Sequence, residues 1–231
     1  MPPPLRRAVR SFVLRQGRMT DGQRKALDNL WPRFGLDATQ PFDATTAFGR
    51  EAPLILEIGF GNGESLLDQA SQRPEWNFIG VEVHAPGIGH LLGELDKRGL
   101  ANVRVYRADA IQVLAERIPD AGLHGIHLYF PDPWPKKRHH KRRIVNEDFV
   151  ALIARKLGPG GCFHAATDWE EYATWMVEQL NRCPELRNSS SDGRFVENTG
   201  RRPHTRFERR GTRLGHGVWD LLYERKDSVG A

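Results

Sequence analysis

A single carboxylate in the middle of this chain of 231 residues lies between prolines, next to an aromatic ring and a cluster of cations. Asp132 belongs to the sequence Pro-Asp-Pro-Trp-Pro at 131–135, which follows an apolar run at 126–130. Prolines fix φ and remove backbone donors, so this loop is expected to be neither helix nor central strand. Residues 136–143 then contain six Lys or Arg and two His, a pattern suited to binding phosphates. A carboxylate, an aromatic face and cations on one loop suggest chemistry on a nucleic-acid base.

The charge run also has simpler interpretations. A solvated face, a nuclear-localisation-like string or a nonspecific nucleic-acid patch would show the same residues. The composition favours a polyanionic partner without proving one, because the net charge is +5 and the pI is about 9.5. The first 20 residues contain five Arg and no acid. The rest of the chain has to decide between these interpretations.

Length and cysteine content narrow the class of protein. A chain of 231 residues suits one α/β domain with a sizeable core. The two cysteines, Cys162 and Cys183, have no metal-ligand spacing, so we expect a reducing compartment and no bound metal. No apolar run is long enough to span a membrane, and we expect a cytoplasmic protein. The Arg-rich start would also suit an organellar transit peptide.

From residue 54 the chain alternates between expected strands and helices. The strands are 54–58, 77–81, 103–106, 125–130 and 161–167, and the helices are 64–72, 87–98, 110–117, 147–157 and 169–181. Two late strands, near Phe195 and at 218–225, would complete a seven-stranded, mostly parallel sheet. With helices on both faces, this is the doubly wound, Rossmann-like α/β class. Residues 1–45 are expected to form a basic, partly flexible extension with a helical candidate around 22–30, and residues 46–231 a single domain.

The first expected strand leads into a glycine-rich turn, Gly-Phe-Gly-Asn-Gly at 59–63. Glycines here allow the backbone to approach a ligand at the start of a helix. The dinucleotide fingerprint would need a third glycine where Glu64 stands, and no Gly-Lys-Ser/Thr follows. The turn therefore argues against both an NAD-type site and a P-loop.

Acidic residues accompany the ends of the first three expected strands. Glu57 lies just before the glycine turn, Glu82 ends the second strand and Asp109 follows the third. These positions suit, in turn, a cationic aminoacyl or sulfonium group, a ribose diol and an adenine amino group. S-adenosylmethionine has all three groups and no phosphate. Each acid alone could equally be a surface cap, but three in register with strand ends favour a ligand.

These residues resemble known families. Residues 57–63 together with Glu82 resemble the first motifs of class I S-adenosylmethionine-dependent methyltransferases. The sequence Phe-Pro-Asp-Pro-Trp-Pro-Lys-Lys-Arg-His at 130–139 is more specific. It is similar to the signature of tRNA (guanine-N7-)-methyltransferases, which form 7-methylguanosine at position 46 of the tRNA variable loop. Further similar blocks at 10–12, 17–20, 81–84, 166–169 and 205–208 extend the resemblance over nearly the whole chain.

The resemblance implies a tRNA substrate, S-adenosylmethionine as cofactor and a set of site residues, with Asp132 as the catalytic residue. We expect a monomer or homodimer that needs no obligate protein partner. The implied cofactor contacts are Glu57, Gly59, Gly61, Glu82, Asp109 and Asp132. The implied guanosine contacts are Lys136, Asp168, Thr205, Arg206, Phe207 and Glu208. The implied RNA contacts are Arg138, His139, His140, Lys141, Arg142 and Arg143, with phosphates also neutralised by Arg201, Arg202, Arg206, Arg209 and Arg210.

The chemistry implied by the resemblance needs little acid–base help. Guanine N7 carries a lone pair and no proton, so its attack on a methyl group needs no general base. Asp132 would then act by positioning or by stabilising positive charge. Asp168 or Glu208 would accept from the guanine N1–H and exocyclic amine, and Trp134 is a candidate stacking face.

Two other functions remain open from the sequence. A class I methyltransferase of this kind could act on a purine N6, on rRNA or on a basic protein site. The chain could also be a noncatalytic RNA-binding subunit with a relict cofactor fold. Such a subunit is expected to lose the acids at its strand ends, whereas this chain keeps all of them.

Overall fold

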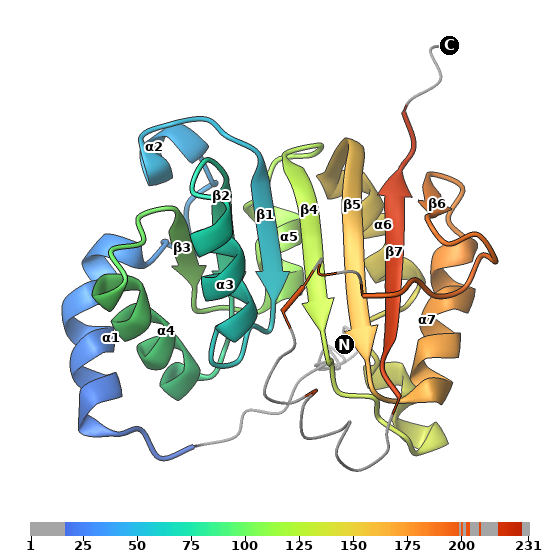
Figure 1. Cartoon of the computed structure of the whole chain (residues 1–231), viewed down its shortest axis with the longest axis horizontal. Coiled ribbons are helices and arrows are strands. Elements are labelled where there is room, and N and C mark those ends of the chain that lie inside the picture. Colours follow the sequence, from blue (N-terminus) through green and yellow to red (C-terminus); the bar gives the residue numbers. More distant parts are fainter. Residues whose placement is uncertain (1–16, 199, 201, 204–207, 209–216, 228–231) are drawn as a thin grey trace, which may run out of the picture.

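The computed structural model describes residues 17–198, 200, 202–203, 208 and 217–227, and its strands form one seven-stranded sheet (Figure 1). The strand order is β3-β2-β1-β4-β5-β7-β6. Neighbouring strands from β3 to β5 pair in parallel, while β7 pairs antiparallel with both β5 and β6. The predicted fold class, a mostly parallel, doubly wound sheet, is confirmed.

The elements follow the expected alternation closely. The strands are β1 (Leu54–Ile58), β2 (Asn77–Val81), β3 (Val103–Tyr106), β4 (Leu123–Tyr129), β5 (Leu157–Thr167), β6 (Leu186–Asn188) and β7 (Trp219–Arg225). The helices are α1 (Asp21–Phe34), α2 (Ala44–Phe48), α3 (Glu64–Gln72), α4 (Ala85–Lys97), α5 (Ala110–Glu116), α6 (Glu147–Lys156) and α7 (Glu170–Asn181), with a 3-10 helix η1 (Lys137–Arg142). None of the helices in the described ranges is both long and apolar enough to cross a bilayer.

The strand predicted near Phe195 is wrong. The sixth strand lies earlier, at β6, where an Arg187–Glu224 ion pair of 2.8 Å joins it to β7. A turn then follows, in which the Asp192 carboxylate accepts from the backbone N–H of Arg194 at 2.9 Å. Among the described residues after this turn, Val196 pairs its backbone with β7, through an isolated bridge to Asp220. Because these residues form the turn, no strand can form near Phe195.

Apolar side chains pack on both faces of the sheet because its strands alternate between them. In β1, Ile55 belongs to the core that also contains residues of α1, α3 and α4, and Leu56 to the core that contains residues of α5, α6 and α7. Strands buried on both faces are typical of parallel sheets covered by helices. In Figure 1, the carboxyl ends of β1 to β5 all point to the lower edge.

The expected N-terminal helix is longer than its candidate range and packs against the sheet domain. α1 begins with a capping box, in which the Thr20 hydroxyl accepts from Gln23 N and the Gln23 side chain accepts from Thr20 N. Phe34 at its end is fully buried, and Gly35 forms a bridge to Val105 of β3. A Cβ on Gly89 of α4 would lie 2.4 Å from the Gln23 carbonyl oxygen, so α1 and α4 are in close contact. The domain boundary near residue 45 stays a prediction.

Candidate active site

A pocket of about 400 Å³ lies at the carboxyl ends of the first four strands. Its lining includes Gly59 after β1, Glu82 after β2, Asp109 after β3 and Asp132 after β4. Open α/β sheets bind their ligands at this edge, and the volume suits a small molecule. The fold thus brings together three of the four predicted acids. Glu57 and Gly61, also predicted to contact a cofactor, are not among the lining residues.

The glycine turn is held in place by the carboxylate of Glu82. One Glu82 oxygen accepts from Gly61 N at 3.0 Å, and the other accepts from Val83 N at 2.6 Å and His84 N at 2.9 Å. Gly59 and Gly61 have φ values of +67° and +58°, which glycine adopts at no steric cost. Glu82 therefore fixes the turn to the end of β2 while its side chain lines the pocket.

The start of α4 supports the same turn from the other side. A Cβ on Gly87 would lie 2.1 Å from the Gly61 carbonyl oxygen, so only glycine fits at this position. A hydrogen bond of 3.0 Å joins His90 Nδ1 to the carbonyl oxygen of Asn62. The turn is thus held between β2 and α4.

Asp109 is both a helix cap and a pocket residue, the two roles that the sequence left open for it. It is the N-cap residue of α5, where its Oδ1 accepts from Ile111 N at 2.9 Å. It also lines the pocket. Capping fixes the orientation of this carboxyl group relative to the strand end.

Glu57 is the most unusual acid near the site. It is 3% exposed, and its Oε2 has no hydrogen-bond partner among the described residues. Burial raises the pKa of Glu57 to about 8, and a hydrogen bond with Ser65 offsets this only in part. The carboxyl group is therefore mainly protonated at pH 7. A cationic ligand nearby would favour its ionised form, so an orphaned acid at this position fits the predicted sulfonium cofactor.

The loop after β4 has the irregular backbone that its prolines predict. Phe130 and Trp134 have φ values of +52° and +46°, a region that L-residues other than glycine rarely adopt. The backbone N–H of Phe130 donates to the Ala166 carbonyl at 2.7 Å, and Arg143 Nε donates to the Pro133 carbonyl at 3.0 Å. These two bonds hold the loop while Asp132 remains exposed at the pocket.

The basic run forms the 3-10 helix η1, directly after this loop. Its Arg138 and Lys141 are exposed, and the Arg142 guanidinium lies 4.5 Å from the Trp134 ring centroid. The His139 ring meets the same indole edge-on, at 5.9 Å. Desolvation, with the charges of neighbouring Lys and Arg, lowers the pKa of His139, so this ring is neutral at pH 7. Trp134 thus packs within the helix and loop.

The last residue of the predicted RNA-contact set is an internal one. Arg143 is 1% exposed, and its guanidinium forms a 3.0 Å ion pair with Glu171 and lies over the rings of Tyr172 and Trp175. This side chain has no surface left for RNA. The prediction for Arg143 is therefore corrected: the residue ties the Asp132 loop to α7.

The predicted guanosine contacts are only partly described. Lys136 is exposed just before η1, and Asp168 is half-buried just after β5. Thr205, Arg206 and Phe207 lie outside the described residues, as do Arg201, Arg209 and Arg210. Glu208 is buried and accepts from Arg202 with both carboxylate oxygens, at 2.5 and 3.0 Å. Arg202 is itself 2% exposed, so the prediction that it neutralises phosphates is wrong.

Sequence reasoning missed a group of buried polar side chains next to the site. Tyr129, His164 and Asp220 are all at least nine-tenths buried and are joined by hydrogen bonds. The available signal was a polar residue alternating with apolar ones inside a strand, as at His164 and Asp220. Such residues are costly to bury unless they are paired.

Comparison with known proteins agrees with this geometry. The family described as "Putative methyltransferase" matches residues 51–221. Two solved structures share the fold: the 16S rRNA methyltransferase KamB (TM-score 0.58, 17% identity, 81% of this chain and 96% of that one) and a 16S rRNA (adenine(1408)-N(1))-methyltransferase from Catenulisporales acidiphilia (TM-score 0.58, 15% identity, 85% and 94%). The strand-end pocket and these likenesses define the class: a Rossmann-like methyltransferase domain.

Relatives in sequence narrow the class to one family. The chain is 60% identical over 219 residues to the tRNA (guanine-N(7)-)-methyltransferase of Methylococcus capsulatus, covering 95% of each chain. It is 56% identical over 228 residues to the protein of the same name from Alkalilimnicola ehrlichii, covering 97% and 96%. The chain belongs to the tRNA (guanine-N(7)-)-methyltransferase family.

Proposed function

We propose that this protein transfers the methyl group of S-adenosylmethionine to N7 of guanosine 46 in the tRNA variable loop, forming 7-methylguanosine. The observation that carries the proposal is the loop after β4. Asp132 on this loop lines the acidic pocket, and the exposed cations of η1 follow within a few residues. A pocket of small-molecule size and an exposed cationic surface therefore adjoin one loop, in a chain that belongs to the family.

The pocket suits the proposed cofactor because its charges are acidic. Its described lining includes Glu82, Asp109 and Asp132 and no Lys or Arg, which disfavours a phosphate-bearing ligand. Glu82 would accept from the ribose hydroxyls and Asp109 from the adenine amino group, and Glu57, buried behind the lining, would act on the cationic end through its charge. When bound, the cofactor supplies an electrophilic methyl group on a positively charged sulfur.

Guanosine is proposed to bind at the rim, where Asp132, Lys136 and Asp168 follow β4 and β5. Asp168 would accept from the N1–H and exocyclic amine, an edge that adenine lacks. N7 needs no deprotonation, so this chain's residues act by alignment, which can supply about 7–11 kcal/mol of barrier reduction. Asp132 would stabilise the positive charge that moves onto the purine. In folded tRNA the target base is stacked, so its extrusion would cost a few kcal/mol.

The tRNA backbone is proposed to contact Arg138, His139, His140, Lys141 and Arg142, with Arg143 removed from this set. Phosphate contacts of this kind give salt-dependent binding and little sequence information. The other cation of η1 that is exposed, Lys137, belongs to the same surface. We also propose a cytoplasmic location, which a tRNA substrate favours, and activity without a second protein.

The test uses the purified full chain alone, tritiated S-adenosylmethionine and bulk tRNA that lacks the modification. The expected product is 7-methylguanosine confined to variable-loop fragments. Label in another nucleoside would refute the acceptor, and no transfer despite cofactor binding would refute independence from a partner.

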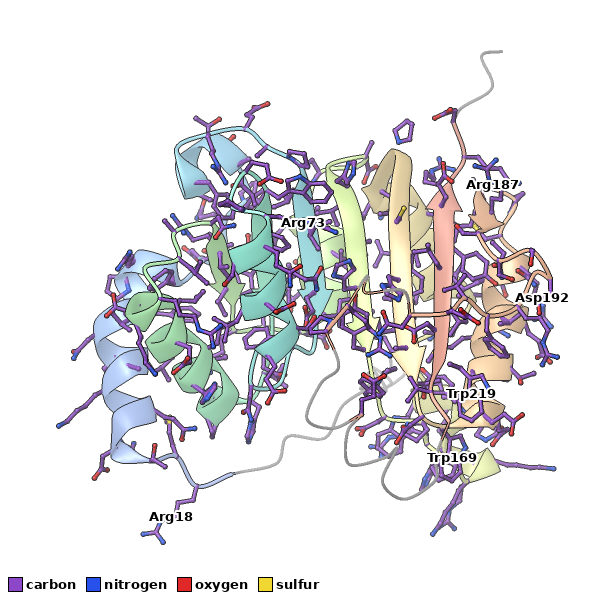
Figure 2. The ribbon with its side chains drawn as sticks, in the orientation of Figure 1. Arg18, Arg73, Trp169, Arg187, Asp192 and Trp219 are labelled. Atoms are coloured by element: carbon purple, nitrogen blue, oxygen red, sulfur yellow. The ribbon has the colours of Figure 1, made fainter. Side chains whose placement is uncertain are left out.

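The role of Asp132 is tested separately by single-turnover rates at saturating cofactor and tRNA. Asp132→Ala is expected to slow methyl transfer strongly. The matched control is Asp192→Ala, an exposed carboxylate on the turn after β6 (Figure 2) that is not among the pocket-lining residues. Equal rates in the two variants would remove Asp132 from the reaction.

A further inference from the structure

Part of the sheet face that carries α3 is covered by irregular chain. The described segment after β6 passes in front of β7, β5 and β4 (Figure 1). The strands present buried polar side chains towards it: Tyr129 from β4, His164 from β5 and Asp220 from β7. Their neighbours in sequence, such as Leu128, Ala165 and Leu221, belong to the apolar core on the opposite face.

These side chains form one chain of hydrogen bonds across the strands. His164 Nε2 lies 2.9 Å from Asp220 Oδ1, and His164 Nδ1 lies 3.1 Å from the Tyr129 hydroxyl. An Nε2–H that donates to Asp220 leaves Nδ1 to accept from Tyr129. Arg202, from the covering segment, completes the chain: its Nε and Nη2 donate to the two Asp220 oxygens at 2.7 and 2.8 Å.

Arg202 holds a second carboxylate with the same guanidinium. Its Nη1 and Nη2 donate to Glu208 at 2.5 and 3.0 Å. Burial alone would lower the pKa of Arg202, but the hydrogen bonds and charges of Asp220 and Glu208 outweigh it and raise the pKa above its ordinary value. The group stays charged, and its planar fork fixes the relative geometry of both carboxylates.

The same guanidinium touches the loop that carries Asp132. It lies 5.3 Å from the ring centroid of Phe130 and 5.9 Å from that of Tyr129. Phe130 lines the pocket and is the first residue of the loop, two positions before Asp132. Arg202 therefore contacts both Glu208 and the start of the Asp132 loop.

We propose that Arg202 is a positioning residue for methyl transfer. It ties the buried carboxylates of Glu208 and Asp220 to the start of the Asp132 loop, so that this loop keeps the geometry that aligns guanosine with the cofactor. Asp220, anchored by His164 and Tyr129, holds Arg202 in turn. This inference rests on the proposed function, and it makes Glu208 act on guanosine through its place in the ion pair.

A buried ion pair is a poor source of stability, because the desolvation penalty offsets much of the Coulombic attraction. Geometry is the property that an arginine fork supplies and an apolar contact does not. A misplacement of about 1 Å can cost about 100-fold in rate. The expected signature is therefore a loss in kcat for tRNA with cofactor affinity retained.

The test compares Arg202→Lys, which keeps the charge and loses the fork, with Arg187→Lys. Arg187 also pairs with a carboxylate, but it is exposed and lies at the opposite end of the strands from Trp169 (Figure 2). Calorimetry measures the affinity for the cofactor, and steady-state assays with unmodified tRNA give kcat and KM. Thermal unfolding shows whether each variant is folded. We expect Arg202→Lys to lower kcat about 100-fold and to leave the cofactor Kd at the wild-type value.

A second variant covers the case in which Arg202→Lys does not fold. The triple variant Arg202→Met, Glu208→Gln, Asp220→Asn removes all three charges together and leaves no unpaired buried ion. It is expected to fold, to bind the cofactor and to lose more kcat than Arg202→Lys.

Two results would overturn the inference. One is a kcat in these variants equal to that of Arg187→Lys. The other is a parallel loss of cofactor binding and folded protein in every Arg202 variant, which would make Arg202 a structural staple. Failure of the proposed function would show itself differently: neither the wild type nor Arg187→Lys would form 7-methylguanosine. In that case the inference is refuted together with the proposed function.

Discussion

Replacing Gly87 by alanine is expected to weaken cofactor binding, although this residue does not line the pocket. The new Cβ would lie 2.1 Å from the Gly61 carbonyl oxygen and 2.9 Å from its carbonyl carbon. Real Cβ atoms essentially never come closer than 3.0 Å, so the backbone must move by about 0.9 Å, the difference between these distances. The turn is fixed by Glu82, and α4 is also held against α1 at Gly89.

The magnitude follows from the cost of overpacking, which is about 1–3 kcal/mol. If this strain is relieved by moving the turn and Glu82 out of place, cofactor Kd rises by about 5- to 150-fold. The assay is calorimetric titration of the purified chain with S-adenosylmethionine, which gives the cofactor Kd. Thermal unfolding of the same sample shows whether the variant is folded.

Gly93→Ala is the matched control, since it lies in the same helix. Its Cβ would meet only the Ala26 Cβ, at 3.7 Å, which is an ordinary contact. Removing a glycine from a helix interior is expected to stabilise the fold by about 0.5–1 kcal/mol, with no change in cofactor affinity. Equal Kd values for Gly87→Ala and Gly93→Ala would refute the reasoning.

Three further predictions concern charged groups. Burial holds the folded-state pKa of Glu57 at about 8, above its ordinary 4.5, so the folded protein binds one more proton than the unfolded chain between these pH values and loses stability as the pH rises through them. Glu57→Gln should remove this dependence, which is up to about 1.4 kcal/mol per pH unit, from the free energy of urea unfolding measured without cofactor. Equal pH slopes in the variant and the wild type would contradict this. Arg143→Met should lower the free energy of unfolding by about 2 kcal/mol, by orphaning a buried carbonyl and losing packed contacts, whereas Lys141→Met should not change the urea midpoint. Neutralising Lys137, Arg138 and Lys141 together should raise the KM for tRNA and reduce the slope of log affinity against log salt by about 2–3; an unchanged slope would exclude phosphate contacts there.

The sequence predicts well which residues meet at the carboxyl ends of the first strands, because their positions are local or follow from strand order. β1, β2 and β3 have the expected bounds, and parallel pairing brings Gly59, Glu82 and Asp109 to one edge. The hydrogen bond from Gly61 to Glu82 is a consequence of that pairing. Nothing in local sequence, however, distinguishes Glu57 as the acid that burial protonates.

The proposed acceptor side depends on contacts between residues far apart in the chain, and there residue type alone misleads. Arg143 and Arg202 belong to basic runs that predict solvent-exposed cations, yet each is buried and paired with a carboxylate that sequence spacing does not reveal: Glu171 for one and Asp220 for the other. Cations of two kinds therefore occur in the run at 136–143. Lys137, Arg138 and Lys141 are exposed, whereas Arg143 points inward and holds the Asp132 loop. We therefore expect that replacing a buried arginine by a neutral side chain changes kcat. Replacing an exposed cation in the same way should change KM for tRNA and its salt dependence.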